Sequence, residues 1–292
     1  MCKKYPLPGK HQGRFIVFGE VVWDVFPDQK RLGGAPFNFA YYFKRAGGNP
    51  VIISAVGNDA LGTEALTEIK TAGIATGNVR IDPERETGRV VITLSGNRHR
   101  FEIIRNTAWE HIDCPGAIAE NGTGLYMGTL ARVSIHNKGV CDRLLTACRG
   151  KPVCVDLNLR KRLYDKDDIA FLLKQTTHVK ANEAEIRILR SLGLIGDAGF
   201  ETAAEELITR YGLQYCCITL GARGAVGADK RTTVRIKAFP AKKGGDSVGA
   251  GDAFTATWLA HLFRGASLSE ALTEAAQVGA IVASSKGALA VF

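Results

Sequence analysis

The chain has 292 residues, of which 46% are hydrophobic and 23% are charged. This composition is typical of a globular protein with a core large enough to need no disulfide or metal cross-links. The net charge of +9 is dispersed, without a run of five like charges. This pattern favours a basic surface, or a field that attracts anions such as nucleotides, over a nucleic-acid-binding arm.

Cysteine usage and the chain's beginning bear on its cellular location. The seven cysteines are odd in number and form no C-x-x-C pair, which favours free thiols in a reducing compartment over a disulfide framework or zinc site. The basic residues 1–14 lead into no apolar segment of a secretory signal, and no stretch has membrane-spanning length without charge. We therefore expect a cytoplasmic protein with no membrane and no nucleic-acid partner.

Short apolar segments alternate with longer amphipathic ones along the chain. The expected strands are RFIVFGE, VIISAVG, GLYMG, PVCVDLN, HVKAN and YCCITLG. The expected helices lie near residues 38–47, 59–72, 134–149, 183–192, 202–211, 250–263 and 267–284. Strand, turn and helix in repeated order predict βαβ units and a mostly parallel sheet, here a single α/β domain over residues 1–292.

Two regions interrupt this order. Residues 21–34 alternate around a Pro-Asp-Gln-Lys turn, and residues 87–106 contain VVITL and RFEII around Ser95-Gly96-Asn97. Both patterns predict β-hairpins. Two hairpins inserted into an α/β core indicate a small β lid beside it.

The segment GGDSVGAGDAF, residues 244–254, precedes a predicted helix. A helix that begins at Gly249-Ala250-Gly251 presents unpaired backbone N–H groups at its positive end, where a phosphate can reach them. Asp252 in the same turn suits a general base for an attacking hydroxyl. The structural alternative is an ordinary turn, with the aspartate favoured at a helix start.

Six motifs in order resemble the ribokinase-like (pfkB) family of sugar kinases. They are Gly33–Ala40 (GGAPFNFA), AVGNDALG with Asp59, DLNLR with Asp156, KANEAE, TLGARGA, and Asp246–Asp252 (DSVGAGD). The resemblance covers the chain from about residue 15 to its end. It implies a ribokinase-like three-layer αβα core with a mostly parallel sheet and a small β lid.

The resemblance also implies phosphoryl transfer from ATP to a sugar hydroxyl. Asp252 would be the catalytic base, and the N–H groups of Gly249, Ala250 and Gly251 would hold the phosphoryl group. The ATP-binding residues by resemblance are Asn182, Thr219, Gly221, Gly224, Gly249 and Gly251. No G-x-x-x-x-G-K-[ST] motif is present, which excludes a P-loop kinase on that pattern.

Two cation sites follow from the resemblance. Asn182 and Glu185 form an N-x-x-E motif that would order Mg²⁺ through water, although the same pair is also typical of a helix N-terminal capping box. Asp246, with backbone near Ser285 and Gly287, would bind a monovalent cation such as K⁺. A loop that follows a helix explains that last sequence equally well.

The expected sugar-binding residues are Asp24, Gly33, Gly34, Asn38, Arg105 and Arg160. A carboxylate at Asp24 can accept two vicinal hydroxyls, and the glycines let a sugar approach the backbone. The alternative for Asp24 is a solvated hairpin carboxylate, and for the two arginines it is an ordinary surface position. The hairpins would cover the sugar and exclude water, and they could pair between two subunits of a homodimer.

Several segments, among them Gly19-Glu20 and Gly128–Arg132, resemble the fructokinase branch most. Arginines 105 and 160 also fit a 2-keto-3-deoxygluconate kinase, whose substrate carries a carboxylate, and a nucleoside kinase is a further alternative. Outside kinases, the rivals are a non-catalytic sugar or nucleotide sensor on this fold and a nucleic-acid-binding protein. The retained Asp252 and glycines argue against the sensor, and the dispersed charge argues against nucleic acid.

Overall fold

The computed structural model describes residues 13–95, 98–242 and 244–290. Its main feature is a nine-stranded sheet that is parallel except for two antiparallel strands at one edge. Across the sheet the strands are β13 (Thr233–Ile236), β12 (Ala225–Asp229), β11 (Tyr215–Thr219), β10 (His178–Asn182), β9 (Val153–Asp156), β8 (Gly122–Gly128), β1 (Arg14–Phe18), β4 (Pro50–Gly57) and β5 (Val79–Asp82). The six strands expected from the sequence are all present.

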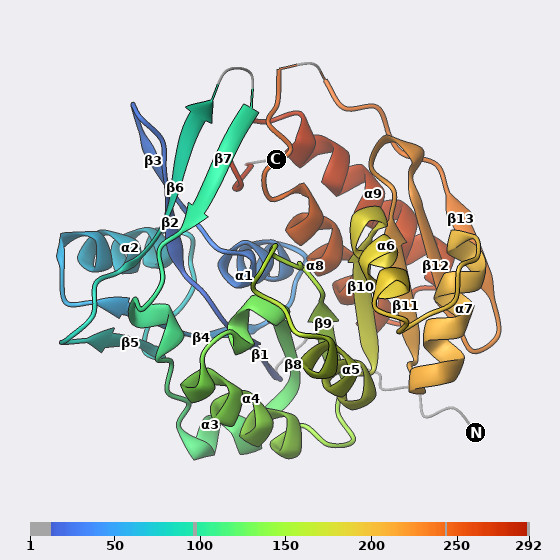
Figure 1. Cartoon of the computed structure of the whole chain (residues 1–292), viewed down its shortest axis with the longest axis horizontal. Coiled ribbons are helices and arrows are strands. Elements are labelled where there is room, and N and C mark those ends of the chain that lie inside the picture. Colours follow the sequence, from blue (N-terminus) through green and yellow to red (C-terminus); the bar gives the residue numbers. More distant parts are fainter. Residues whose placement is uncertain (1–12, 96–97, 243, 291–292) are drawn as a thin grey trace.

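Helices cover both faces of this sheet, as Figure 1 shows. Side chains of β1 alternate between them: Phe15 and Val17 belong to one core cluster, and Ile16 and Phe18 to the other. The first face carries α1 (Ala35–Arg45), α2 (Ala60–Thr71), α8 (Ala250–Phe263) and α9 (Leu268–Ala283). The second carries α3 (Gly116–Asn121), α4 (Ile135–Ala147), α5 (Lys166–Gln175), α6 (Glu183–Ser191) and α7 (Phe200–Tyr211). The expected αβα layering is confirmed.

A second, small sheet rises from the edge of this core (Figure 1). It contains β3 (Lys30–Gly33), β2 (Val22–Val25), β6 (Gly88–Ser95) and β7 (Arg98–Ile103), in that order. Strands β2–β3 and β6–β7 are antiparallel pairs, and β2 joins β6 in parallel. Both expected hairpins therefore exist and form one sheet; Gly96 and Asn97 of the second turn lie outside the described residues.

The sequence did not predict β5, β12, β13, α3 or α5. Strands β5 (VRID) and β13 (TVRI) have four residues each, with a charged residue in the middle, so they show too little apolar periodicity to be recognised. In the described parts of the chain, six cysteines are free thiols, as expected. No described helix is both long and apolar enough to cross a membrane.

The motif AVGNDALG joins the core to the small sheet. The Asp59 carboxylate accepts the Gly62 N–H (2.7 Å) as the N-cap of α2, and it also accepts the N–H (2.8 Å) and hydroxyl (2.7 Å) of Thr87. Thr87 directly precedes β6. Gly57 and Gly62 leave no room for a side chain, because a Cβ at Gly62 would lie 2.1 Å from the Gly57 carbonyl oxygen. Asp59 thus holds the entry to the second hairpin.

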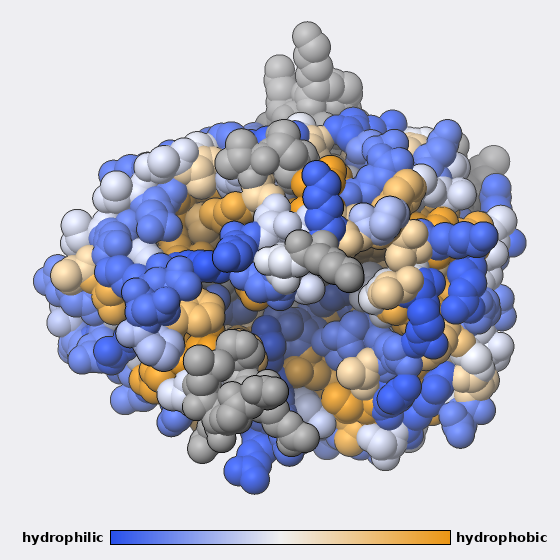
Figure 2. Space-filling view, turned by 90° about the horizontal axis from the view of Figure 1, so that it is seen from above, coloured by the Kyte–Doolittle hydropathy of each residue, from blue (hydrophilic) through white to orange (hydrophobic). Residues whose placement is uncertain are grey.

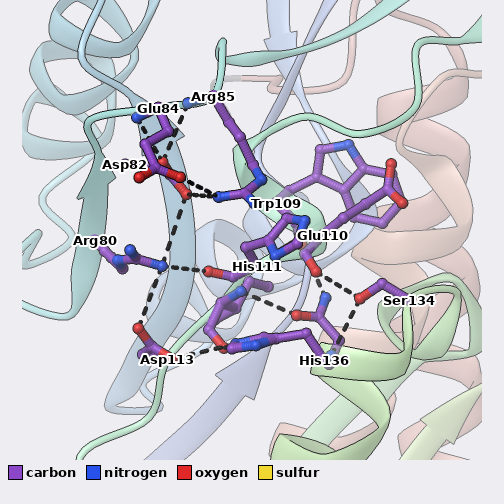
Figure 3. Close-up of polar contacts among 12 residues, drawn as sticks. Arg80, Asp82, Glu84, Arg85, Trp109, Glu110, His111, Asp113, Ser134 and His136 are labelled. Carbon is purple, nitrogen blue, oxygen red and sulfur yellow. Dashed lines mark hydrogen bonds and ion pairs between the residues drawn. The ribbon is translucent and has the colours of Figure 1, made fainter.

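A polar network beside this entry holds the two chain segments that lead into β6 and out of β7 (Figure 3). The buried Asp82 carboxylate accepts the backbone N–H groups of Glu84 (2.9 Å) and Arg85 (3.1 Å), and it lies 3.3 Å from the Arg85 guanidinium. Arg80 donates to the His111 carbonyl at 3.0 Å. The base of the small sheet is therefore cross-linked to the core by ion pairs and by hydrogen bonds to the backbone.

Asp59→Ala is expected to lower the free energy of unfolding by about 2–4 kcal/mol, because it removes a helix cap and also leaves Thr87 without its acceptor. Chemical denaturation measures this loss. The matched control is Ser267→Ala, which removes only the N-cap of α9 and should cost about 1 kcal/mol. Equal losses in the two variants would contradict a role for Asp59 in holding the second hairpin.

Candidate active site

The start of α8 meets α1 at the carboxyl ends of the central strands. There the Asn38 amide donates to the Asp252 carboxylate at 2.8 Å, although the two residues are 214 positions apart. Figure 2 looks at the molecule from above relative to Figure 1 and shows a hollow with hydrophilic residues near the middle of this face. The structure therefore brings two predicted site residues into direct contact.

Asp252 has an environment suited to proton transfer. Burial raises its pKa to about 7, and repulsion from Asp156 adds to this, whereas the Asn38 hydrogen bond and the charges of Lys180 and Arg160 oppose it. A carboxyl group with a pKa near neutrality is partly ionised at physiological pH and can still accept a proton. This combination is typical of a general base.

The backbone before Asp252 is shaped as the glycine-rich segment predicts. Gly249 has φ 77°, and a Cβ there would lie 2.5 Å from the Ala288 carbonyl oxygen. The Ala250 N–H donates to the Ser247 carbonyl at 3.3 Å, so it is already engaged. Among the described residues, nothing accepts the N–H groups of Gly249 or Gly251. Two free donors at a positive helix end can bind an anion.

A buried ion pair lies beneath this helix start. The Lys180 ammonium is 3.1 Å from Asp156, and Thr255 of α8 donates to the same carboxylate at 3.2 Å. Burial alone would lower the pKa of Lys180, but Asp156, Glu185 and other acids hold it above its ordinary value. No motif in the sequence predicted a role for Lys180. The available signal was a lysine inside a strand of an otherwise buried parallel sheet, where a charge needs a partner.

Several of the expected sugar-binding residues lie where the small sheet leads into the N-terminal end of α1. A Cβ at Gly33 would lie 2.9 Å from the Asp24 carboxylate, and one at Gly34, where φ is 103°, would lie 2.4 Å from the Glu20 carbonyl oxygen. Burial raises the pKa of Asp24 to about 6, against the opposing charges of Arg160 and Arg31. Glycine is therefore required at Gly34, where the obstacle is backbone and φ is positive, whereas a Cβ at Gly33 would displace the end of the Asp24 side chain.

The two predicted arginines lie in different surroundings. Arg160 is exposed, and its charge lowers the pKa of both Asp24 and Asp252. Arg105 instead forms a two-bond ion pair with Glu110, at 3.0 and 2.8 Å. It lines a separate cavity that also includes Arg132 and Arg162. Only Arg160 is thus grouped with the other predicted sugar-side residues.

Three predicted nucleotide-binding residues line one cavity: Asn182, Thr219 and Gly221. They meet there because Asn182 and Thr219 are neighbours in the parallel pairing of β10 with β11. Gly224 is not part of this lining. A Cβ at Gly224 would lie 1.9 Å from the Ile236 carbonyl oxygen, so its glycine serves the packing of the adjacent turn.

The N-x-x-E motif forms the capping box of α6. The Glu185 N–H donates to the Asn182 side chain (3.0 Å), and the Glu185 carboxylate accepts the N–H groups of Asn182 (2.7 Å) and Leu159 (3.0 Å). In the part of the chain that the structure describes, no group of three or more His, Cys, Asp and Glu residues could hold a metal ion. Both Glu185 oxygens already accept hydrogen bonds. The motif would therefore contact Mg²⁺ through water, with phosphates as the direct ligands.

Asp246 forms an ion pair that no sequence motif predicted. Arg31 of β3 donates to its carboxylate at 3.0 Å, and the N–H groups of Gly287 (2.8 Å) and Val248 (3.1 Å) donate to the same group. The sequence carried no local signal for this pair, because the two residues are 215 positions apart. The ion pair links the small sheet to the loop that precedes α8.

Comparison with known proteins shows the family to which this chain belongs. The model of the pfkB family carbohydrate kinases matches residues 6–291. The chain belongs to the pfkB carbohydrate kinase family. Fructokinases from Salmonella typhimurium and Escherichia coli are 28% and 29% identical to this pfkB kinase, each over 94% of both chains. The structure of a fructokinase with bound ATP from Xylella fastidiosa superposes with a TM-score of 0.84 at 20% identity, covering 94% of this chain and 93% of that one.

The expected family and fold are therefore confirmed. This pfkB kinase is an enzyme, an ATP-dependent carbohydrate kinase. Its family membership also argues against the rival of a nucleic-acid-binding protein.

Proposed function

We propose that this kinase transfers the γ-phosphoryl group of ATP to a hydroxyl of a neutral sugar, with fructose as the first candidate. The observation that carries the proposal is the Asn38–Asp252 contact at the start of α8. At this contact, the carboxyl group of Asp252, whose pKa is raised, lies in the same turn as the free N–H donors of Gly249 and Gly251. The similarity to fructokinases of two bacteria supports the choice of sugar.

In the proposed reaction, Asp252 accepts the proton of the sugar hydroxyl as its oxygen attacks the γ-phosphorus. The bond between the γ-phosphorus and the bridging oxygen breaks, and ADP leaves with the electron pair. Asn38 orients the carboxylate through its 2.8 Å hydrogen bond. The N–H groups of Gly249 and Gly251 stabilise the charge on the phosphoryl oxygens, whereas Ala250, whose N–H is engaged, would contribute only after a local rearrangement.

ATP is proposed to bind along Asn182, Thr219 and Gly221, with its γ-phosphate at the start of α8. When bound, Mg²⁺ would neutralise phosphate charge, and Asn182 and Glu185 would contact it through water. We retain a monovalent cation at Asp246 as part of the proposal. Arg31 already supplies a positive charge to that carboxylate, so any dependence of activity on K⁺ should be weak.

A neutral sugar is favoured over an acid sugar by the charges at the site. Asp24 and Asp252 both contribute carboxyl groups there, and Arg160 is the predicted arginine whose charge reaches them. Arg105 is neutralised by Glu110. The other cations that act on these acids, Arg31 and Lys180, are paired with Asp246 and Asp156. A substrate carboxylate would therefore meet two acids opposed mainly by Arg160, which is unfavourable in a partly buried site.

The test is ADP release with Mg²⁺-ATP and a panel of fructose, ribose, tagatose, 2-keto-3-deoxygluconate and adenosine. We expect fructose to give the highest kcat/KM. Preference for 2-keto-3-deoxygluconate or adenosine would contradict the proposed sugar but keep the kinase. No sugar-dependent ADP release with any compound would contradict the proposed catalytic function and favour a sensor.

Three further features belong to the same proposal. The small sheet acts as a lid that excludes water from the transferring phosphoryl group. Pairing of two such lids would give a homodimer. The free cysteines suit a reducing, cytoplasmic location.

A further inference from the structure

The carboxyl group of Glu20 takes no part in the reaction described above. Glu20 lies two residues after the end of β1, and it is 3% exposed. Its Oε2 atom has no hydrogen-bond partner among the described residues. Buried carboxyl oxygens in folded proteins almost always have a partner, so an unpaired one points to a ligand.

The position of Glu20 places it among the sugar-side residues. Its backbone carbonyl packs closely against Gly34, and its carboxyl group lies near the N–H of Ala35 at the start of α1. The charges of Asp252 and Arg160 both act on it. Glu20 therefore shares its surroundings with the proposed base and with the arginine of the sugar side.

Its protonation agrees with such a position. Burial raises the pKa of Glu20 to about 7; Arg160 opposes this shift and Asp252 adds to it. Near neutral pH the group can thus either accept or donate a hydrogen bond. A sugar hydroxyl, which is both donor and acceptor, suits both states.

We propose that Glu20 is a further sugar-binding residue, whose free Oε2 atom hydrogen-bonds a hydroxyl of the acceptor sugar other than the one that is phosphorylated. This inference rests on the proposed function and extends it. With Glu20, three carboxyl groups surround the acceptor, so the site selects a neutral polyhydroxy compound. Held at a second hydroxyl, the sugar would be oriented with its reacting hydroxyl toward Asp252.

The test compares Glu20→Gln with the wild type by steady-state kinetics and by the rise in Tm that the sugar induces. Glu20→Gln keeps the size of the side chain but alters its donors and acceptors. We expect the sugar KM to rise about 10–100-fold, as for loss of a hydrogen bond to a charged group. The KM for ATP should stay within about twofold, and the sugar should no longer raise the Tm.

Two further variants keep the test decisive. Glu20→Met fills a similar volume without a polar atom and should raise the sugar KM at least as much. Thr176→Val is the matched control: its side chain is buried, and its hydroxyl donates to the carbonyl of Val153 at the start of β9, at the opposite end of the sheet from the site, so the sugar KM should not change. The sugar KM is measured over concentrations from well below to well above the wild-type KM, and the Tm shift is measured at a sugar concentration that saturates the wild type.

Unchanged sugar KM and sugar-induced Tm shift in both Glu20 variants would overturn the proposal. An equal rise in Thr176→Val would also overturn it, because the effect would then be structural. These results differ from failure of the proposed function, in which the wild type itself phosphorylates none of the sugars.

Discussion

Asp252→Asn is expected to lower kcat by about 10²–10⁴-fold, the range for removal of a general base. The KM for ATP should change little, because the free N–H groups of Gly249 and Gly251 remain. ADP release at saturating substrates measures the loss. Asp229→Asn, at the last residue of β12, is the control and should keep the wild-type rate. Wild-type turnover in Asp252→Asn would mean that the base is another residue.

The same base predicts the pH dependence of the wild type. Asp252 must be ionised to accept a proton, and its pKa is raised to about 7. The value of kcat/KM should therefore fall about tenfold per pH unit below that point.

A stability measurement separates lost chemistry from lost folding in Asp252→Asn. Burial raises the pKa of Asp252 from 3.8 to about 7 in the folded chain. Between these pH values the folded state binds more protons than the unfolded state, so this group makes the protein less stable as pH rises. Asparagine carries no charge. The variant should thus be at least as stable as the wild type at pH 8, although its kcat is much lower.

Lys180→Met is expected to lower the free energy of unfolding by about 3–5 kcal/mol, because it leaves the buried Asp156 carboxylate without its counter-charge. Chemical denaturation measures the loss. It should also move the acid limb of kcat/KM to higher pH, since Lys180 lowers the pKa of Asp252. A loss below about 1 kcal/mol would contradict a structural role for the pair.

Two companion variants define the origin of that loss. Lys174→Met, on an exposed position of α5, should change stability by no more than about 0.5 kcal/mol. Adding Asp156→Leu to Lys180→Met should recover part of the loss, because the unpaired buried charge is then removed. A double variant as unstable as the sum of both single losses would instead indicate damage to packing.

Local sequence patterns determined much of this protein. Apolar segments of strand length, separated by amphipathic helices, predicted the αβα layers because alternation and helical periodicity are properties of neighbouring residues. The glycine-rich segment before Asp252 predicted a tight helix start for the same reason. Short edge strands such as β5 escaped prediction, since four residues carry too little periodicity.

Tertiary structure alone decided which charges meet. Arg31 pairs with Asp246 and Lys180 with Asp156, and within the described parts of the chain no group pairs with Oε2 of Glu20. Both pairs depend on the order of strands and on how the small sheet lies against the α8 loop, which no local pattern encodes. The energy of a charge depends on burial and on its neighbours in space. Motifs therefore predicted the residue types of the site, and packing decided which of them are free to act.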